Sequence, residues 1–249
     1  MNGYKHEGVG WMDMTINKGF RWSTSRGYLR PALERSNVEI TSKALTTKIL
    51  FDGTKAIGVE YEVKGEKKQV LANKEVILCG GAINSPQLLM LSGVGNADEL
   101  KEHGITPVLN LPGVGENLQD HLEVYVQQEC TKPITLYTAQ WKFPHNMIRI
   151  GLQWFANQTG WGATTHLESG GFSRGDDTVD FANVQYHFLP STVNDHGRST
   201  GDRHAFQVHV GPMRPTSRGY LKLKSNNPQD HPKIVANYMS TEFDRKEMR

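Results

Sequence analysis

Cysteine, net charge and long apolar runs are all scarce in this 249-residue chain. Its two cysteines, Cys79 and Cys130, are too few for a disulfide framework and favour a reducing compartment. A formal net charge of +2 argues against a nucleic-acid-binding protein, which normally carries a clustered basic face. No apolar run approaches the roughly 20 residues that a membrane-spanning helix needs. The composition, with 37% hydrophobic and 22% charged residues, is instead typical of a globular protein with a sizeable core.

The most informative segment joins a short apolar run to a glycine-rich turn and a second apolar stretch. Residues 76–79 (VILC) predict a buried strand that enters a tight turn at the two glycines that follow. Asn84 or Ser85 then caps a helix that has Pro86 in its first turn, and Gly93 ends it. Such a unit gathers backbone N–H groups and the positive end of a helix, which suits an anionic or electron-rich cofactor edge. A plain packing turn is the alternative, because many folds reuse this unit.

The rest of the pattern predicts a mixed α/β fold. Residues 38–72 contain short β-rich runs separated by turns, which indicates an antiparallel β-meander. We expect helices at residues 97–103 and 141–157, and strands at residues 182–189, 205–210 and 221–224. The half after about residue 122 therefore looks like an antiparallel sheet with helices, distinct from the first half.

Residues 80–95 (GGAINSPQLLMLSGVG) also match a family signature. A small residue, Ser-Pro, two aliphatic residues and a Ser-Gly-aliphatic-Gly ending resemble the second signature of the glucose–methanol–choline (GMC) family of FAD-dependent oxidoreductases. The run at residues 112–121 (PGVGENLQDH) is similar to a loop that this family places beside the flavin, although the pattern alone favours a plain connection. The resemblance implies that residues 1–121 belong to a Rossmann-like FAD-binding domain. It implies a substrate domain, with an antiparallel sheet and helices, for residues 122–249.

Four further segments are similar to the choline-oxidising members of the family. They are residues 10–15 (GWMDMT), 21–29 (RWSTSRGYL), 164–172 (TTHLESGGF) and 208–219 (VHVGPMRPTSRG). The resemblance implies oxidation of choline to betaine aldehyde, a step toward glycine betaine, by hydride transfer to FAD. It also implies a quinone-type electron acceptor and a mitochondrial location, in the inner membrane or the matrix, and leaves membrane association open. Another small alcohol, oxidised by a different kind of GMC enzyme, is the alternative substrate.

The cofactor-side residues that the resemblance implies lie in the first half of the chain. Leu45 is at the position whose backbone meets the adenine, and a backbone contact tolerates many side chains. Small residues are expected below the flavin and its ribityl chain, because they let the backbone approach closely. The complete set is Leu45, Gly80, Gly81, Ala82, Asn117 and Asp120. FAD is the cofactor that the resemblance implies, with no metal.

The substrate-side residues are expected in the second half. The quaternary ammonium of choline has no hydrogen to donate, so its site needs a carboxylate and aromatic faces. The resemblance implies that Glu168, in a His-x-Glu string with His166, is this carboxylate. Trp161 and Phe172 are the candidates for the aromatic wall. A solvated surface carboxylate is the alternative for Glu168, because most glutamates are exposed.

His209 is the candidate catalytic residue within this chain. Its predicted strand alternates apolar and polar side chains, so Gln207 and His209 share the polar face. The resemblance places a histidine here near the substrate hydroxyl, where it donates a hydrogen bond to the developing alkoxide. A satisfied structural histidine is the alternative, and His121 and His187 are weaker candidates.

Two parts of the family pattern are absent from the printed sequence. None of the glycine-rich segments matches the Rossmann Gly-x-Gly-x-x-Gly turn, which holds the pyrophosphate of FAD. The family's principal base, a histidine near the C-terminal end, would lie beyond Arg249. The charged run at residues 243–249 also looks like the start of a helix. We therefore expect a fragment that alone binds FAD weakly and turns over no choline, with an inactive remnant as a further alternative.

Overall fold

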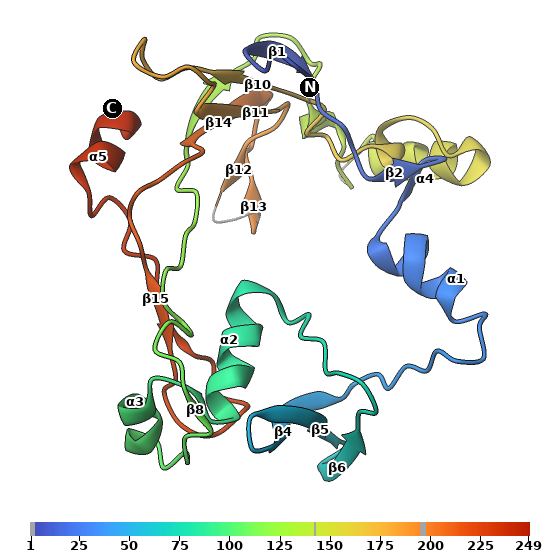
Figure 1. Cartoon of the computed structure of the whole chain (residues 1–249). Helices are drawn as coiled ribbons and strands as arrows, with labels where there is room; N and C mark the ends of the chain where they lie inside the picture. The colour runs from blue at the N-terminus through green and yellow to red at the C-terminus, as the bar shows by residue number, and fades with distance from the viewer. Residues whose placement is uncertain (1–2, 142, 195–197) are drawn as a thin grey trace. The chain divides into compact units, whose positions relative to one another are not determined.

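The computed structural model describes residues 3–141, 143–194 and 198–249, and its fold is mixed α/β, as predicted (Figure 1). The chain forms two compact units, and each is built from separate stretches of sequence. The first, here called the sheet unit, comprises Met1–Glu39, His121–Arg214 and Glu247–Arg249. The second, here called the meander unit, comprises Ile40–Asp120 and Pro215–Lys246.

The division between the units differs from two consecutive domains. One crossing between the units lies between Asp120 and His121, one residue from the expected boundary after residue 121. Residues 1–39, however, fold with the second half of the chain, because their strand pairs with a strand at residues 169–173. Residues 215–246 fold with the first half, where Leu118 and Gly219 pair backbone to backbone.

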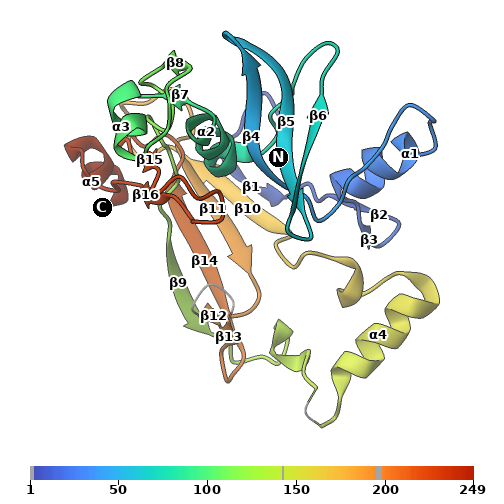
Figure 2. The same ribbon diagram turned by 90° about the horizontal axis from the view of Figure 1, so that it is seen from below.

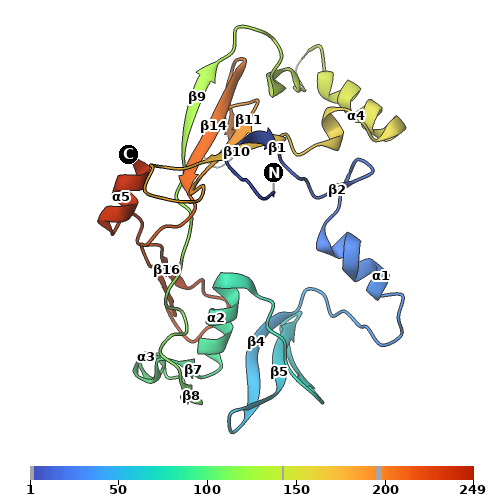
Figure 3. The same ribbon diagram turned by 45° about the horizontal axis from the view of Figure 1, so that its top comes forward.

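The sheet unit is built on a five-stranded antiparallel sheet (Figure 3). In spatial order its strands are β1 (Gly8–Trp11), β10 (Ser169–Ser173), β11 (Val184–Leu189), β14 (Ala205–Pro212) and β9 (Val124–Glu129). The predicted strands at residues 182–189 and 205–210 are confirmed as β11 and β14. The two strands pair in register over their length, with His187 opposite His209.

Shorter elements surround this sheet in the sheet unit. They are β2 (Ile16–Asn17), β3 (Phe20–Arg21), η1 (Ser25–Leu29), α1 (Arg30–Ala32), η2 (Leu136–Thr138), α4 (Asn146–Asn157), η3 (Trp161–Ala163), β12 (Val193–Asn194) and β13 (Ser199–Thr200). Helix α4 begins later than the predicted residue 141, because a residue before proline, here Phe143, disfavours the helical conformation. Its Trp154 packs edge-on against Phe20, with ring centroids 5.1 Å apart, and donates a 2.8 Å hydrogen bond to the carbonyl of Gly19.

The meander unit takes its name from the antiparallel sheet of β4 (Leu45–Asp52), β5 (Lys55–Val63) and β6 (Glu66–Leu71), seen side by side in Figure 2. This confirms the predicted meander from residue 45 onward, whereas residues 38–41 form no strand. The buried hydroxyl of Ser92 accepts a 2.8 Å hydrogen bond from the backbone N–H of Ile49. The same hydroxyl donates to the carbonyl of Leu88, so it attaches β4 to the following helix.

That helix, α2 (Gly81–Leu91), begins earlier than the sequence predicts. Its N-cap is Gly80, so Asn84 and Ser85 are not caps and Pro86 lies inside the helix. Pro86 is the sixth residue of the helix, so it lies beyond the first turn and leaves the carbonyl of Ala82 without its intrahelical N–H donor. The predicted end at Gly93 is confirmed, since this residue has a φ of 90°.

The predicted buried strand at residues 76–79 is wrong. These residues pair with no strand in the described part of the chain, and Ile77 is 72% exposed. Without a partner strand the backbone has no ladder to join. The parallel ladder of the described residues is the short pair β7 (Val94–Gly95) and β8 (Leu109–Asn110).

The core of the meander unit lies where α2 meets α3 (Ala97–Glu102) and β15 (Tyr220–Lys222). Met90, Leu100, Leu221 and Leu223 form it, and each is at most 8% exposed. Strand β15 pairs with β16 (Lys233–Val235), and α5 (Glu242–Met248) follows. Among the described residues, no helix has the length and apolar character needed to cross a membrane.

Candidate functional site

The cofactor-side candidates lie in the meander unit, and two of them share a cavity. Leu45, at the start of β4, and Gly80, before α2, both line a cavity of about 790 Å³. Val59 and Leu88 contribute apolar walls, and residues 76–79 also line it. The cavity thus combines apolar side chains with an exposed stretch of backbone.

A second cavity, of about 360 Å³, contains two further candidates. Ala82 of α2 and Asn117 of the glycine-rich loop line it together. The α2 residues of this cavity, such as Ala82 and Leu89, lie on the opposite helix face from Leu88, which lines the first cavity. Ser85 borders both cavities, so the N-terminal half of α2 separates them.

The N-terminus of α2 has properties that suit an anionic or electron-rich group. No side chain caps it, which leaves the N–H groups of its first turn to solvent or a ligand. Gly81 has a φ of 76°, which only glycine adopts readily, and the space where a Cβ would stand is open. The small residues expected at residues 80–82 therefore form an accessible turn with unpaired donors.

The glycine-rich loop at residues 113–119 is held against β15 by its backbone. The N–H of Leu221 donates a 2.6 Å hydrogen bond to the carbonyl of Gly115, and Leu118 pairs with Gly219 in both directions. Gly115 has a φ of 85°, and a Cβ there would stand 2.2 Å from the carbonyl oxygen of Leu221. Loop and strand are thus in direct backbone contact next to Asn117.

Asp120 lines neither of these cavities. Its carboxylate accepts a short hydrogen bond from the hydroxyl of Tyr238. This hydrogen bond, with some help from burial, raises the pKa of the Tyr238 hydroxyl. In this structure Asp120 therefore fixes the chain beyond β16 to the end of the loop.

The substrate-side candidates lie in the sheet unit, where one sheet face is polar. His187, His209 and Tyr125 are directly opposite one another on three adjacent strands, so their side chains share this face. The rings of Tyr125 and His209 have centroids 5.4 Å apart. The predicted alternation that places Gln207 with His209 is consistent with this register.

Both ring nitrogens of His209 are engaged by protein groups. Its Nδ1 lies 2.6 Å from Oε1 of Glu123, and its Nε2 makes a short contact with Nε2 of Gln207. An amide nitrogen can only donate, so Nε2 is the acceptor and Nδ1–H donates to Glu123. In this arrangement His209 has no N–H left for an alkoxide, which matches the structural alternative for this residue.

His187 is better placed to meet a ligand than its weaker sequence signal indicates. It lines a cavity of about 950 Å³, together with Thr164, Thr165 and Leu167. Residues alternate between the two sheet faces along β11, and this alternation puts His187 on the same face as His209. That signal in the sequence could have made His187 a stronger candidate.

His166 and Glu168 lie close enough for their charges to interact. Burial lowers the pKa of His166, and the carboxylate of Glu168 opposes this effect. Glu168 precedes β10 directly, and its carbonyl accepts a 2.8 Å hydrogen bond from the N–H of Met12. The half-buried pair therefore lies just before the start of β10, on either side of Leu167, which lines the cavity.

The aromatic candidates lie on two different elements of the sheet unit. Trp161 begins η3 and is 38% exposed. The ring of Phe172, on β10, faces the imidazole of His6 at 6.1 Å between centroids. Within the described residues, no group of three His, Cys, Asp or Glu side chains is arranged to hold a metal ion.

Comparison with known protein families and sequences identifies relatives of the whole chain. Residues 1–123 match the family model described as GMC oxidoreductase. The chain is 58% identical over 249 residues to mitochondrial choline dehydrogenase of Homo sapiens, covering 100% of this chain and 42% of the human protein. It is 51% identical over 251 residues to the oxygen-dependent choline dehydrogenase of Chromohalobacter salexigens, of which it covers 44%. The chain therefore spans less than half the length of these curated relatives.

Solved structures with the same fold are more distant in sequence. A formate oxidase variant from Aspergillus oryzae superimposes with a TM-score of 0.86 at 22% identity, covering 98% of this chain and 46% of that one. Pyridoxine 4-oxidase from Mesorbium loti gives a TM-score of 0.79 at 24% identity, with coverages of 97% and 43%. At these identities the likeness shows the fold alone.

Proposed function

Because the chain belongs to the GMC oxidoreductase family, we propose that it supplies flavin-contacting and substrate-facing residues to an FAD-dependent enzyme that oxidises choline. The family match and the two choline dehydrogenases support the reaction class and the substrate. The pairing of His166 with Glu168 supports the choice of choline, because a half-buried carboxylate can attract a quaternary ammonium group.

The meander unit fits a flavin dinucleotide at three points. Uncapped N–H groups at the start of α2 can donate to an anionic or electron-rich edge. The cavity that contains Leu45 and Gly80 offers apolar walls for a flat ring, and Asn117 borders the second cavity. FAD, when bound, supplies the redox chemistry by accepting a hydride from the alcohol carbon.

The sheet unit provides the groups for the substrate. In this proposal Glu168 attracts the quaternary ammonium, while Trp161 and Phe172 offer aromatic faces to it. His187, in the cavity, is placed to hydrogen-bond the hydroxyl. His209 acts on the same hydroxyl only if its contact with Gln207 opens, and otherwise orders the polar face with Glu123.

We further propose a quinone-type electron acceptor and a mitochondrial location, in the inner membrane or the matrix. The location rests on the likeness to the human mitochondrial protein, and the acceptor rests on the family resemblance of the sequence. The relative from Chromohalobacter salexigens is named oxygen-dependent, so the acceptor needs its own assay. Turnover with a soluble quinone in the absence of oxygen would support the quinone, and turnover that requires oxygen would contradict it.

The test of the cation site replaces Glu168 with glutamine in the flavin-loaded enzyme. Loss of one charge-assisted contact should raise the KM for choline by about 10- to 100-fold, while the neutral tert-butyl isostere of choline keeps its KM. Asp177→Asn is the matched control, because Asp177 is an exposed carboxylate in the turn after β10.

A titration of the same variant gives a readout that is independent of turnover. Glu168→Gln removes the charge that favours the His166 imidazolium, so the pKa of His166 should fall further, as followed by NMR of its ring. An unchanged KM for choline would reject Glu168 as the cation site. An equal rise in KM for choline and for its neutral isostere would favour another alcohol as the substrate.

A further inference from the structure

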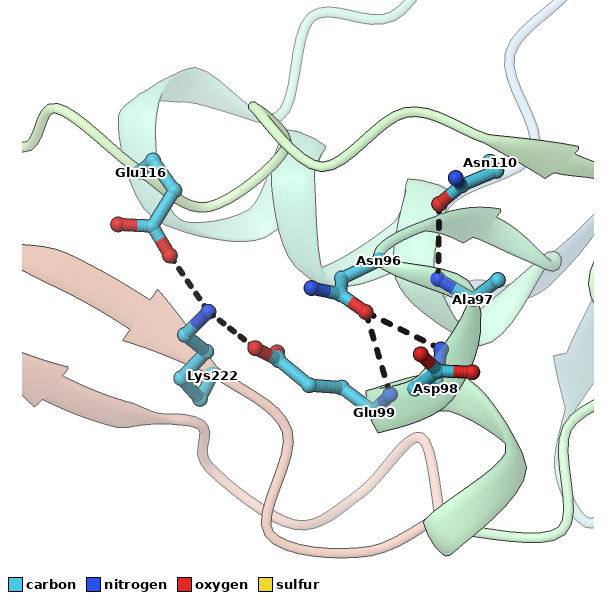
Figure 4. Close-up of polar contacts among 7 residues, drawn as sticks. All are labelled: Asn96, Ala97, Asp98, Glu99, Asn110, Glu116 and Lys222. Atoms are coloured by element: carbon cyan, nitrogen blue, oxygen red, sulfur yellow. Dashed lines mark hydrogen bonds and ion pairs between the residues drawn. The ribbon is translucent and has the colours of Figure 1, made fainter.

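Lys222 lies between two carboxylates that belong to different segments (Figure 4). Its Nζ is 2.7 Å from Oε1 of Glu99 and makes a short ion pair with Glu116. Glu99 belongs to α3 and Glu116 to the glycine-rich loop, whereas Lys222 itself ends β15. One ammonium group therefore connects three segments of the meander unit.

The Glu99 end of this bridge is firmly anchored. Asn96 caps α3, and its Oδ1 accepts hydrogen bonds from the N–H groups of Asp98 at 3.1 Å and Glu99 at 3.4 Å. The N–H of Ala97 donates in turn to Oδ1 of Asn110 at 3.0 Å. The capped start of α3 holds the backbone of Glu99, and its carboxylate reaches Lys222 from there (Figure 4).

The Glu116 end lies next to a flavin-side candidate. Glu116 directly precedes Asn117, which has a φ of 60° and borders the cavity shared with Ala82. The backbone bond from Leu221 to Gly115 already places the loop on β15, one residue from each member of the ion pair. Backbone and side chain thus hold the same loop from two directions.

The electrostatics favour a permanent bridge. Side chains of Lys222, Glu99 and Glu116 are 24%, 39% and 43% exposed, so solvent screens the pairs only in part. Burial disfavours the charged amine, but the hydrogen bonds with Glu116 and Glu99 outweigh this, and the pKa of Lys222 is raised. Lys222 therefore carries its charge throughout the working pH range.

We propose that Lys222 is a positioning residue: anchored on Glu99, it holds Glu116 and so sets the loop at residues 113–119, with Asn117, against α2. The inference rests on the proposed function to the extent that FAD is the ligand this loop is expected to meet. It assigns a role to a lysine outside every sequence motif that pointed to the flavin.

The experiment compares Lys222→Met, Lys222→Arg and Glu116→Gln with the unaltered protein. Hydrogen exchange of the amides of residues 113–119 is measured without flavin, and the Kd for FAD is measured by quenching of flavin fluorescence. Lys222→Met should speed exchange in the loop about 5- to 10-fold and weaken FAD binding by a similar factor. Lys222→Arg should retain most of the loop protection and most of the FAD affinity. Lys224→Met, at an exposed neighbouring lysine, should change neither the exchange rate of the loop nor the Kd for FAD.

The two measurements separate failure of this inference from failure of the proposed function. Glu116→Gln keeps the pair of Lys222 with Glu99, so it reports on the loop even if Lys222→Met unfolds. Loop exchange and FAD affinity both unchanged in Lys222→Met and Glu116→Gln would overturn the positioning role and leave the proposed function intact. Failure of the longer protein, with its pyrophosphate-binding turn present, to bind FAD would overturn the proposed function, while loop exchange would still decide whether Lys222 holds the loop.

Discussion

Replacing Gly115 with alanine should selectively destabilise the meander unit. Gly115 has a φ of 85°, a conformation that costs an L-residue about 1–2 kcal/mol. The new Cβ would stand 2.2 Å from the carbonyl oxygen of Leu221, so loop and strand must separate. Separation breaks the 2.6 Å hydrogen bond from Leu221 to Gly115, worth about 0.5–1.5 kcal/mol. The free energy of unfolding should therefore fall by about 2–3 kcal/mol, a large share of a typical domain's stability.

The assay has to report on the meander unit itself. The tryptophans at residues 11, 22, 141, 154 and 161 all lie in the sheet unit, so their fluorescence follows the wrong part of the chain. Urea unfolding followed by hydrogen exchange at β15 and at the loop is the suitable measurement. Gly113→Ala is the matched control, because no atom lies within 4 Å of a Cβ at this position. Equal stability of the two variants would refute the reasoning about Gly115.

Two further replacements test buried polar contacts of the meander unit. Asp244, 3% exposed, accepts hydrogen bonds from the N–H groups of Thr216 at 2.7 Å and Ser217 at 2.8 Å. Burial alone would raise its pKa, but the bonds from Ser217 and Thr216 outweigh it and hold the pKa well below the usual range. Its stabilisation is thus complete above about pH 4 and lost as the pH falls further. Asp244→Asn should cost about 1.5–3 kcal/mol at pH 7 and flatten this acid dependence, measured as urea unfolding across a pH series. Ser92→Ala should lower the free energy of unfolding by about 1–3 kcal/mol in the same assay at neutral pH, because it leaves the Ile49 N–H without its acceptor. A decrease of less than about 0.5 kcal/mol would contradict this.

The alternation of apolar and polar residues was sufficient to predict strands in which that alternation is strong. Alternation along residues 45–71 and 205–210 predicts the strands that the structure contains. The sequence pattern failed where a strand needs a distant partner strand in order to form. Residues 76–79 have the composition of a buried strand, but no described strand pairs with them. The start of α2 was missed for a different reason, because a proline usually marks the first turn of a helix and here Pro86 lies inside it.

The division into units could not be predicted from the sequence either, because it also depends on pairing between distant segments. Strand β1 joins β10, and Leu118 pairs with Gly219, across long separations that no local pattern encodes. Family resemblance identified Ala82 and Asn117 separately, and the structure places them on one cavity. It did not point to Lys222, because that residue acts through Glu116 and not through a motif of its own.

His209 shows how a correct pattern can still leave a role undecided. Alternation alone places it on the polar face of β14, and the register with β11 and β9 agrees. The availability of its ring depends instead on Glu123 and Gln207, which occupy both nitrogens. A donor to an alkoxide needs a free N–H, so the face that His209 occupies does not decide its chemistry. That chemistry depends on Gln207, from the same strand, and on Glu123, which directly precedes β9. The same test favours His187, because its place on a cavity, and not its position in a motif, is what a substrate would meet.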